Sequence, residues 1–167
     1  MSAHIRLAVL ADCPRVTNLA TLAYSRYLER MDKKPAPMLE DYAARIAEDR
    51  IFVLEIQPTC PCGEKVDHDP QSSFSPTIVG FVMLSPGEDA LLLNNLAVDP
   101  TMQGRGYGKL LVSFAEEIAC KTGFRQISLY TNEVMTENLQ MYPRLGYTET
   151  HRATEKGFNR VFFSKKL

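Results

Sequence analysis

Apolar residues recur with two spacings along the chain, and each spacing is typical of one kind of secondary structure. Intervals of three and four residues predict helices, whereas short alternating or continuous runs of apolar and β-branched residues predict strands. Strands are expected over residues 4–9, 50–56, 77–85, 90–98, 125–131, 147–152 and 158–164. Helices are expected from the N-cap residue Asp12 to about Met31, and over residues 39–46, 106–121 and 135–145.

The order of these elements predicts an α/β (α+β) fold. Short connections favour antiparallel pairing, and the helix over residues 106–121 lies between two strands that we expect to form a parallel pair. The length of 167 residues fits a single domain spanning residues 1–167. Asn94 and Asn95 interrupt the apolar strand over 90–98. Two adjacent asparagines inside a strand indicate a β-bulge or an edge that faces a ligand.

Residues 57–76 differ from their surroundings. They contain four prolines and almost no large apolar side chain except Val66 and Phe74. Such a segment buries little surface, so we expect a flexible hairpin insertion. Cys60 and Cys62 form the only close cysteine pair, and a structural zinc site usually needs a second pair. We therefore interpret these two residues as thiols in a loop and expect no metal site.

Composition narrows the classes of protein that fit this sequence. Hydrophobic residues make up 45% of the chain and charged residues 23%, which excludes disorder of the whole chain. Nineteen Lys and Arg balance twenty Asp and Glu, which argues against a nucleic-acid-binding protein. The apolar runs are too short to span a bilayer, and the first ten residues do not resemble a signal peptide. We therefore expect a cytoplasmic protein without a membrane partner.

The segment from Val98 to Lys109 carries the clearest chemistry, because a strand ends there, a glycine-rich turn follows and a helix begins. The first amides of a helix lack intrahelical acceptors, and the helix dipole favours an anion at that end. Glycines let successive N–H groups converge on phosphate oxygens, and Arg105 and Lys109 add positive charge. The segment therefore predicts a phosphate or pyrophosphate site. An ordinary turn is the alternative, although three glycines within five residues exceed what a tight turn requires.

Two common phosphate-binding motifs do not fit this spacing. A nucleotide P-loop needs Ser or Thr after Gly108-Lys109, where this chain has Leu110, and a glycine where it has Gln103. The dinucleotide fingerprint needs a glycine at the position of Lys109 and a place in an opening βαβ unit. A nucleotide-binding domain of another fold remains as a third alternative, and stabilisation by ATP in place of coenzyme A (CoA) would favour it.

The spacing Gln103-x-x-Gly106-x-Gly108 resembles the pyrophosphate signature of the GNAT superfamily of acetyl-CoA-dependent N-acetyltransferases. The preceding residues 96–100 (Leu-Ala-Val-Asp-Pro) are similar to the strand end that leads into the family's loop. Asn138 and residues 142–147 (Tyr-Pro-Arg-Leu-Gly-Tyr) resemble a second family motif. The resemblance implies the GNAT fold, a mixed and mainly antiparallel seven-stranded sheet flanked by about four helices.

The same resemblance implies acetyl-CoA as cosubstrate, bound in a wedge between the strands over 90–98 and 125–131. The residues that would contact it are Leu96, Ala97, Val98, Gln103, Gly104, Arg105, Gly106, Tyr107, Gly108, Lys109 and Asn138. The backbone of Leu96 and Val98 would bind the pantetheine arm and polarise the thioester carbonyl. Tyr142 would protonate the departing thiolate. Periodicity alone favours a different role for Tyr142, packing in the core beside its helical neighbours.

The implied reaction is direct attack by a primary amine, on a small molecule or peptide, without a covalent enzyme intermediate. Many family members carry a Glu near the position of Asn94 and Asn95, and Asn cannot accept a proton at neutral pH. The base is therefore open, and a catalytically silent acyl-CoA sensor on the same fold is the alternative function. Homodimers are common in the family. Candidates for the lining of the acceptor pocket are Tyr24, Tyr27, Met31, Lys33, Lys34, Phe158, Asn159 and Arg160. Candidates for a substitute base are Glu88, Asp89 and Glu133.

Overall fold

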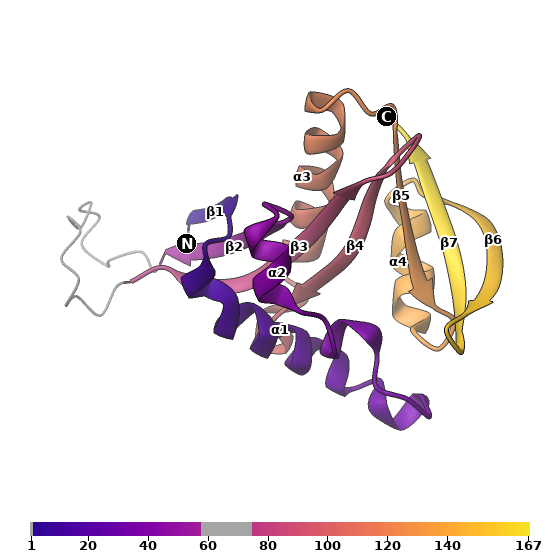
Figure 1. Ribbon diagram of the computed structural model, residues 1–167, viewed down its shortest axis with the longest axis horizontal. Helices are drawn as coiled ribbons and strands as arrows, with labels where there is room; N and C mark the ends of the chain where they lie inside the picture. Colours follow the sequence, from indigo (N-terminus) through magenta and orange to yellow (C-terminus); the bar gives the residue numbers. More distant parts are fainter. Residues whose placement is uncertain (1, 58–74) are drawn as a thin grey trace.

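The computed structural model describes residues 2–57 and 75–167, and their strands form one seven-stranded sheet in the order β1-β2-β3-β4-β5-β7-β6 (Figure 1). The strands are β1 (Ser2–Leu7), β2 (Ile51–Gln57), β3 (Thr77–Pro86), β4 (Leu91–Val98), β5 (Gln126–Asn132), β6 (Thr148–Glu155) and β7 (Phe158–Lys166). The α-helices are α1 (Cys13–Ser25), α2 (Tyr42–Ala47), α3 (Tyr107–Lys121) and α4 (Thr136–Arg144). Short 3-10 turns are η1 (Leu10–Asp12), η2 (Leu28–Arg30), η3 (Ala36–Met38) and η4 (Pro100–Met102).

All neighbouring strands in the sheet pair antiparallel except β4 and β5, which are parallel and are joined through α3. The predicted mixed, mainly antiparallel sheet with four helices is thus confirmed. The predicted insertion over 57–76, including Cys60 and Cys62, falls almost entirely outside the described residues. Within the described part of the chain, no helix combines the length and the apolar character needed to cross a membrane.

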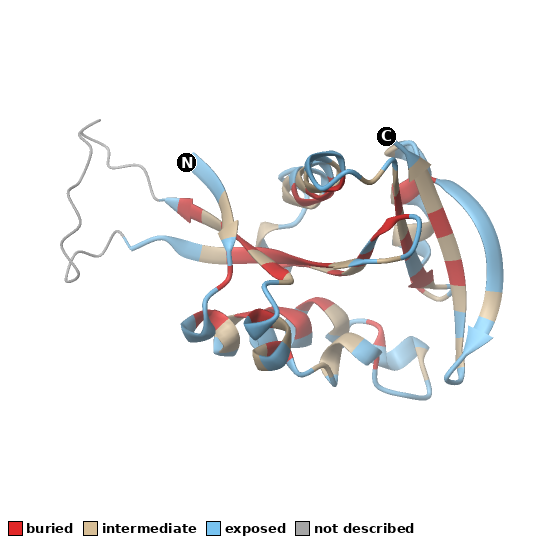
Figure 2. Ribbon diagram, turned by 45° about the horizontal axis from the view of Figure 1, so that its top comes forward, coloured by how far each residue is buried: buried red, intermediate tan, exposed pale blue. Residues whose placement is uncertain are grey.

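The helices cover the sheet on both faces, α1 and α2 on one and α3 on the other (Figure 2). Two apolar clusters match these layers. One contains Val16 and Leu19 of α1 packed against Phe81 of β3. The other contains Leu111 of α3, Tyr142 of α4 and strand residues from the opposite side of the sheet. The sheet is therefore buried on both faces over its centre, as its apolar strands require.

Two helix boundaries differ from the prediction. The first helix ends at Ser25 and not near Met31, and the separate turn η2 follows it. Apolar residues three apart suit a 3-10 turn as well as an α-helix, so the pattern continued past the true end of α1. The second helix begins at Tyr42, because the side chain of Asp41 caps it by accepting the amide hydrogen of Ala44 at 3.1 Å. Leu39, included in the predicted helix, is 70% exposed.

The asparagine pair produces the bulge that the sequence predicted. Asn95 is paired with Met83, but the next pair towards the start of β4 joins Leu93 to Leu84. Asn94 is therefore an extra residue in β4 that opposes no residue of β3. A bulge of this kind bends a strand and increases its twist. The bulge lies halfway along β4, so the strand bends at the point where it separates from β5.

Candidate active site

The strands β4 and β5 separate within the sheet. They pair only from Leu91 to Leu93 on the β4 side, opposite Ile127 to Leu129. The amide of Asp99 donates to the carbonyl of Val79 on β3 at 2.8 Å. Since backbone groups alternate along a strand, the amides and carbonyls of Val98 and Leu96 face away from β3, into the space between β4 and β5. This space is open to a ligand that takes the place of a strand.

The loop between β4 and α3 has the backbone geometry of an anion site. Gly104 and Gly106 have φ angles of 77° and 84°, in the left-handed region that favours glycine. The first intrahelical bond of α3 runs from the amide of Leu110 to the carbonyl of Gly106 at 3.0 Å. The amides of Tyr107, Gly108 and Lys109 therefore have no intrahelical acceptor. A Cβ added to any of the three loop glycines would meet no atom within 4 Å, so the space above them is empty.

A cleft of about 310 Å³ joins this loop to the wedge between the strands. Of the residues that the resemblance assigned to cofactor contact, the cleft is lined by Leu96, Ala97, Val98, Gln103, Gly104, Gly106, Tyr107, Gly108, Lys109 and Asn138. Arg105 is the exception, because it is exposed and does not line the cleft. The Nε2 of Gln103 donates to the carbonyl of Val98 at 3.2 Å, so this side chain links the loop to the end of β4.

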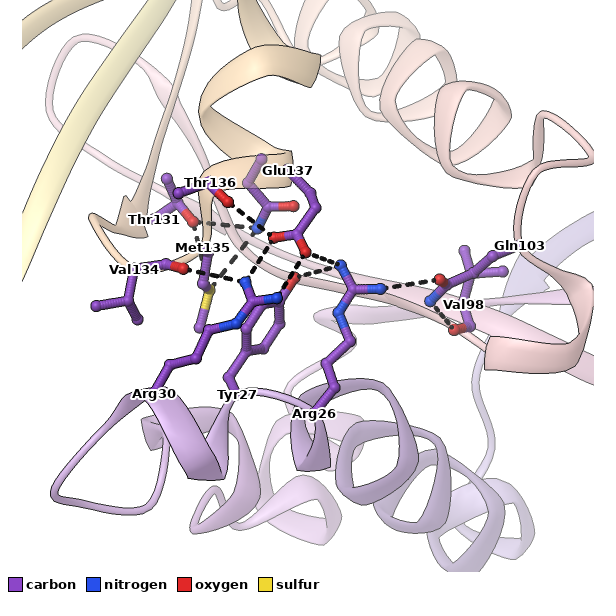
Figure 3. A network of polar contacts seen from close by, with 11 residues as sticks. Arg26, Tyr27, Arg30, Val98, Gln103, Thr131, Val134, Met135, Thr136 and Glu137 are labelled. Carbon is purple, nitrogen blue, oxygen red and sulfur yellow. Dashed lines mark hydrogen bonds and ion pairs between the residues drawn. The ribbon is translucent and has the colours of Figure 1, made fainter.

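An ionic network crosses the cleft between the end of α1 and the start of α4 (Figure 3). Glu137 lies within 3.2 Å of Arg26 and 3.1 Å of Arg30. The guanidinium of Arg26 also donates to Oε1 of Gln103 at 3.4 Å and to the hydroxyl of Tyr27 at 3.0 Å. Hydrogen bonding from Arg30 is the main cause that lowers the pKa of Glu137. The sequence analysis did not identify this network, because its members come from segments about 110 residues apart.

A second cavity, of about 210 Å³, lies next to the cleft on the side of α1 and α2. Four of the predicted acceptor residues line it: Tyr24, Met31, Phe158 and Arg160. Tyr27 lines the cleft instead, and Lys33, Lys34 and Asn159 line neither cavity. The cleft and this acceptor pocket share Tyr24, Leu96 and Asn138, so the two cavities meet at these three residues. Met83, Leu93, Tyr130 and Met135 give the pocket an apolar wall.

The predicted substitutes for a carboxylate base do not lie in the pocket. Glu133 is held by Asn159 at 2.6 Å outside it, and Glu88 and Asp89 lie at the turn between β3 and β4. The carboxylate that does line the pocket is Glu40, the only one there among the described residues, and it pairs with the Nε of Arg45 at 2.9 Å. Glu40 lies between η3 and α2, in a segment that the sequence analysis assigned to a helix. The apolar periodicity there gives no reason to single out a carboxylate, so sequence analysis missed it.

Tyr142 lines the acceptor pocket and not the cleft, with a side chain that is 5% exposed. Its ring packs against Tyr147 and Phe163 at centroid distances of 5.7 and 5.8 Å. Burial raises the pKa of its hydroxyl well above 10, so the group stays protonated at neutral pH. The ring of Tyr142 therefore packs in the core, as the periodicity favours, and the residue also reaches the acceptor pocket. Its role as proton donor stays a prediction.

Asn138 lies where the two cavities meet. Its Nδ2 donates to the Oγ1 of Thr131 at 3.1 Å, which ties the first turn of α4 to the end of β5. The carbonyl oxygen of the side chain remains as an acceptor. Asn138 therefore borders both cavities, and its contact to the cofactor stays a prediction.

Comparisons with solved structures relate this arrangement to acetyltransferases. PaiA N-acetyltransferase from Thermoplasma acidophilum, solved in complex with coenzyme A, has a TM-score of 0.74 and 17% identity, with all of both chains covered. The ribosomal-protein-S18-alanine N-acetyltransferase from Escherichia coli has a TM-score of 0.67 and 17% identity over 99% of this chain and 94% of its own. A nourseothricin acetyltransferase has a TM-score of 0.53 and 22% identity, over 70% of this chain and 64% of its own.

The comparison with curated protein sequences finds no match. A family model described as an acetyltransferase (GNAT) domain matches residues 66–149, half of the chain, from before β3 to the start of β6. That range includes β4, the glycine loop and α4, which line the cleft together with the end of α1. The chain belongs to the GNAT acetyltransferase family.

Proposed function

We propose that this protein is an N-acetyltransferase that moves the acetyl group of acetyl-CoA to a primary amine of a small molecule. The observation that carries the proposal is the meeting of two cavities at Tyr24, Leu96 and Asn138. One cavity has the free amides and positive charge suited to a pyrophosphate, and the other has the size of a small acceptor. The point where they meet lies beside the backbone of β4.

The residues present fit the CoA moiety. The open space over the loop glycines leaves room for phosphate oxygens at the amides that begin α3, and Lys109 and Arg26 line the same cleft. The strand separation leaves the amides of Leu96 and Val98 available to the pantetheine arm. When bound, acetyl-CoA supplies an activated thioester. The relative from Thermoplasma acidophilum, crystallised with coenzyme A, supports the assignment through its shared fold.

The chain's own groups then perform three tasks. A preorganised backbone amide of β4 polarises the acetyl carbonyl. In other enzymes, removal of one such donor raises the activation free energy by roughly 3 kcal/mol. Tyr142, kept protonated by burial, provides the proton that the departing sulfur takes up. Glu40 offers a carboxylate to the incoming ammonium group. Direct transfer is favoured because the described cysteines, Cys13 and Cys120, line neither cavity.

The fold leaves the acceptor open, since the named relatives include a ribosomal-protein-alanine acetyltransferase and a nourseothricin acetyltransferase. A cavity of about 210 Å³ is consistent with the small-molecule amine proposed here, and the end of a peptide is the alternative acceptor. The carboxylate of Glu40 is compatible with a cationic group, and Arg45, Arg50 and Arg160 line the same pocket.

The test begins with the melting temperature of the protein in the presence of acetyl-CoA, CoA, ATP and NAD. A ligand at about a hundred times its Kd stabilises a folded protein by roughly 2.7 kcal/mol. We expect stabilisation by acetyl-CoA and CoA, followed by release of free thiol from acetyl-CoA when a library of primary amines is added. Binding without transfer to any amine would favour a CoA sensor. Stabilisation by ATP or NAD alone would contradict the proposal.

A further inference from the structure

A chain of three hydrogen bonds, one buried and two partly buried, runs behind the point where the cleft and the acceptor pocket meet. The hydroxyl of Tyr24 donates to Oδ1 of Asn95 at 2.7 Å. The Nδ2 of Asn95 donates to the hydroxyl of Tyr42 at 2.8 Å. The hydroxyl of Tyr42 donates to the carbonyl of Pro37 at 2.6 Å. Asn95 and Tyr42 are 3% and 2% exposed, so water does not compete for the hydrogen bond between them.

The direction of this chain follows from its last member. The backbone carbonyl of Pro37 can only accept, so it takes the single hydrogen of the Tyr42 hydroxyl. The oxygen of Tyr42 must then accept from the amide of Asn95, which turns the Nδ2 of Asn95 towards Tyr42 and its Oδ1 towards Tyr24. Oδ1 has no hydrogen, and so Tyr24 must be the donor in that contact. The one hydrogen of the Tyr24 hydroxyl is committed to Asn95.

The hydroxyl oxygen of Tyr24 retains acceptor capacity, and it lies where both cavities meet. Tyr24 lines the cleft and the acceptor pocket alike, at the end of α1 and beside β4. Its hydroxyl is 3.4 Å from the carbonyl of Leu96, whose backbone faces the wedge. Because Tyr24 lines both cavities, its hydroxyl is placed to meet an amine that approaches a bound thioester from the pocket. A neutral primary amine needs a partner for an N–H while its lone pair faces the carbonyl carbon.

We infer that the Tyr24 hydroxyl accepts a hydrogen bond from the attacking amine and orients its lone pair, with Asn95 and Tyr42 as positioning residues that hold this hydroxyl in the accepting direction. The inference rests on the proposed function and assigns the contact made by its nucleophile. Tyr24 does not act as a base, because burial raises the pKa of its hydroxyl well above 10. The amine must therefore lose its ammonium proton to another group before it attacks. The bulge at Asn94 suits this arrangement, since it precedes Asn95 where β4 turns past α1.

Two CoA derivatives test the contact without knowledge of the natural acceptor. In one, the sulfur carries –CH₂–C(=O)–NH–C₂H₅, and in the other –CH₂–C(=O)–O–C₂H₅, which lacks only the N–H. The Kd of each is measured by titration calorimetry with the wild-type protein and with Tyr24→Phe. A neutral hydrogen bond corresponds to roughly a threefold to tenfold change in Kd. We expect the ratio of ester Kd to amide Kd to fall by about that factor in Tyr24→Phe.

Tyr42→Phe tests whether the direction of the Tyr24 hydroxyl matters, because the hydroxyl itself stays in place in this variant. This variant keeps Tyr24 but removes the donor to Pro37, so the Asn95 amide can turn over and the Tyr24 hydrogen is released. The released hydrogen can bond the ester oxygen, and we expect the preference for the amide to fall here too. Tyr147→Phe is the matched control, since it removes a buried hydroxyl that bonds Glu116 outside both cavities. It should leave the preference unchanged.

The outcomes distinguish this inference from the proposed function. If the wild-type protein does not bind CoA, the proposed function fails. If CoA and both derivatives bind, but the ester-to-amide ratio is equal in the wild type and Tyr24→Phe, the inference is overturned and the proposed function stands. The far-UV circular dichroism spectrum and the urea-unfolding midpoint of each variant show whether it retains its fold. A preference lost in Tyr24→Phe but kept in Tyr42→Phe would overturn the roles given to Asn95 and Tyr42.

Discussion

Leu93 of β4 is paired with Leu129 of β5, and this is the last pair that joins the two strands before they separate. One residue later, Asn94 forms the bulge against β3. The separation therefore begins where β4 acquires an extra residue. The local twist added by a bulge gives a physical reason for the divergence. The opening that results contains the backbone of Leu96 and Val98, and the site is built around it.

Substitution of Gly106 by alanine tests the role of the glycine loop. A Cβ there meets no atom, so the cost comes from the φ of 84° alone, roughly 1–2 kcal/mol. The backbone can relieve this strain by shifting the amides of the loop. Loss of one hydrogen bond to a charged phosphate, about 1.5 kcal/mol, corresponds to roughly a tenfold increase in Kd for CoA. Calorimetric titration with CoA, together with urea unfolding, measures both effects.

Gly123→Ala is the matched control for that variant. Gly123 has a φ of 86° and equally open surroundings, but it lies at the other end of α3. It should lose similar stability and keep its CoA affinity. Equal CoA affinity in Gly106→Ala and Gly123→Ala would show that the loop does not bind the pyrophosphate.

Tyr142→Phe should lower kcat while leaving the Kd of CoA unchanged, because the ring packing remains and only the proton donor is lost. General acids contribute typically about 10² to 10⁴ in rate. Burial raises the pKa of Tyr142 well above 10, so loss of its proton does not cause a fall in kcat below pH 10. Any such alkaline fall in the wild type should therefore persist in Tyr142→Phe. Stopped assays of thiol release with any amine accepted by the wild type measure this. Retention of wild-type kcat in Tyr142→Phe would leave only its packing role.

Glu137→Gln should tighten CoA binding. In the structure Glu137 holds Arg26 and Arg30 across the cleft, and its negative charge faces the site of an anionic ligand. Exposed ion pairs contribute about 0.2–1 kcal/mol, so release of Arg26 should lower Kd by up to roughly fivefold. The gain should shrink in high salt, because salt screens these charges. Titration at low and high ionic strength checks it, and weaker binding at low salt would contradict the expectation.

Glu40→Gln should raise the KM of cationic amines more than that of neutral ones, because it removes the only carboxylate that lines the acceptor pocket among the described residues. Glu48→Gln is a fitting comparison. Glu48 also pairs with Arg45, at 3.2 Å, but does not line the pocket. Initial rates with matched cationic and neutral amines measure the difference. Glu48 pairs with Arg50 as well, at 3.0 Å, so the same change in KM for both variants would mean that the effect comes from the arginines of the pocket and not from the carboxylate of Glu40.

The stability of the fold should fall in acid because of Asp12. Arg6 bonds Asp12 at 2.7 Å and also pairs with Glu55, which ties β1 to the start of α1 and to β2. Hydrogen bonding from Arg6 is the main cause that lowers the pKa of Asp12 in the folded state. The stabilisation by ionised Asp12 is therefore complete above the unfolded pKa of about 3.9. It is lost as the pH falls from there through the lower pKa of the folded state.

Asp12→Asn should cost about 2 kcal/mol at pH 7, the contribution of a hydrogen bond to a charged group. It should also flatten the dependence of unfolding free energy on pH between about 5 and 2. Urea unfolding over this range measures both, with exposed Asp89→Asn as the control. A wild-type pH dependence in Asp12→Asn would assign the acid sensitivity to other carboxylates.

The sequence by itself determined the elements of the sheet, the bulge at Asn94 and the glycine loop, because each depends on local spacing and backbone freedom. The tertiary structure alone decided which distant residues meet. Glu40, Arg26 and Glu137 carry no local signal, and the end of α1 at Ser25 depends on a 3-10 turn with the same periodicity. The pairing of Tyr24 with Asn95 joins residues 71 positions apart. Such contacts follow from the packing of α1 and α2 on the sheet, which no local pattern specifies.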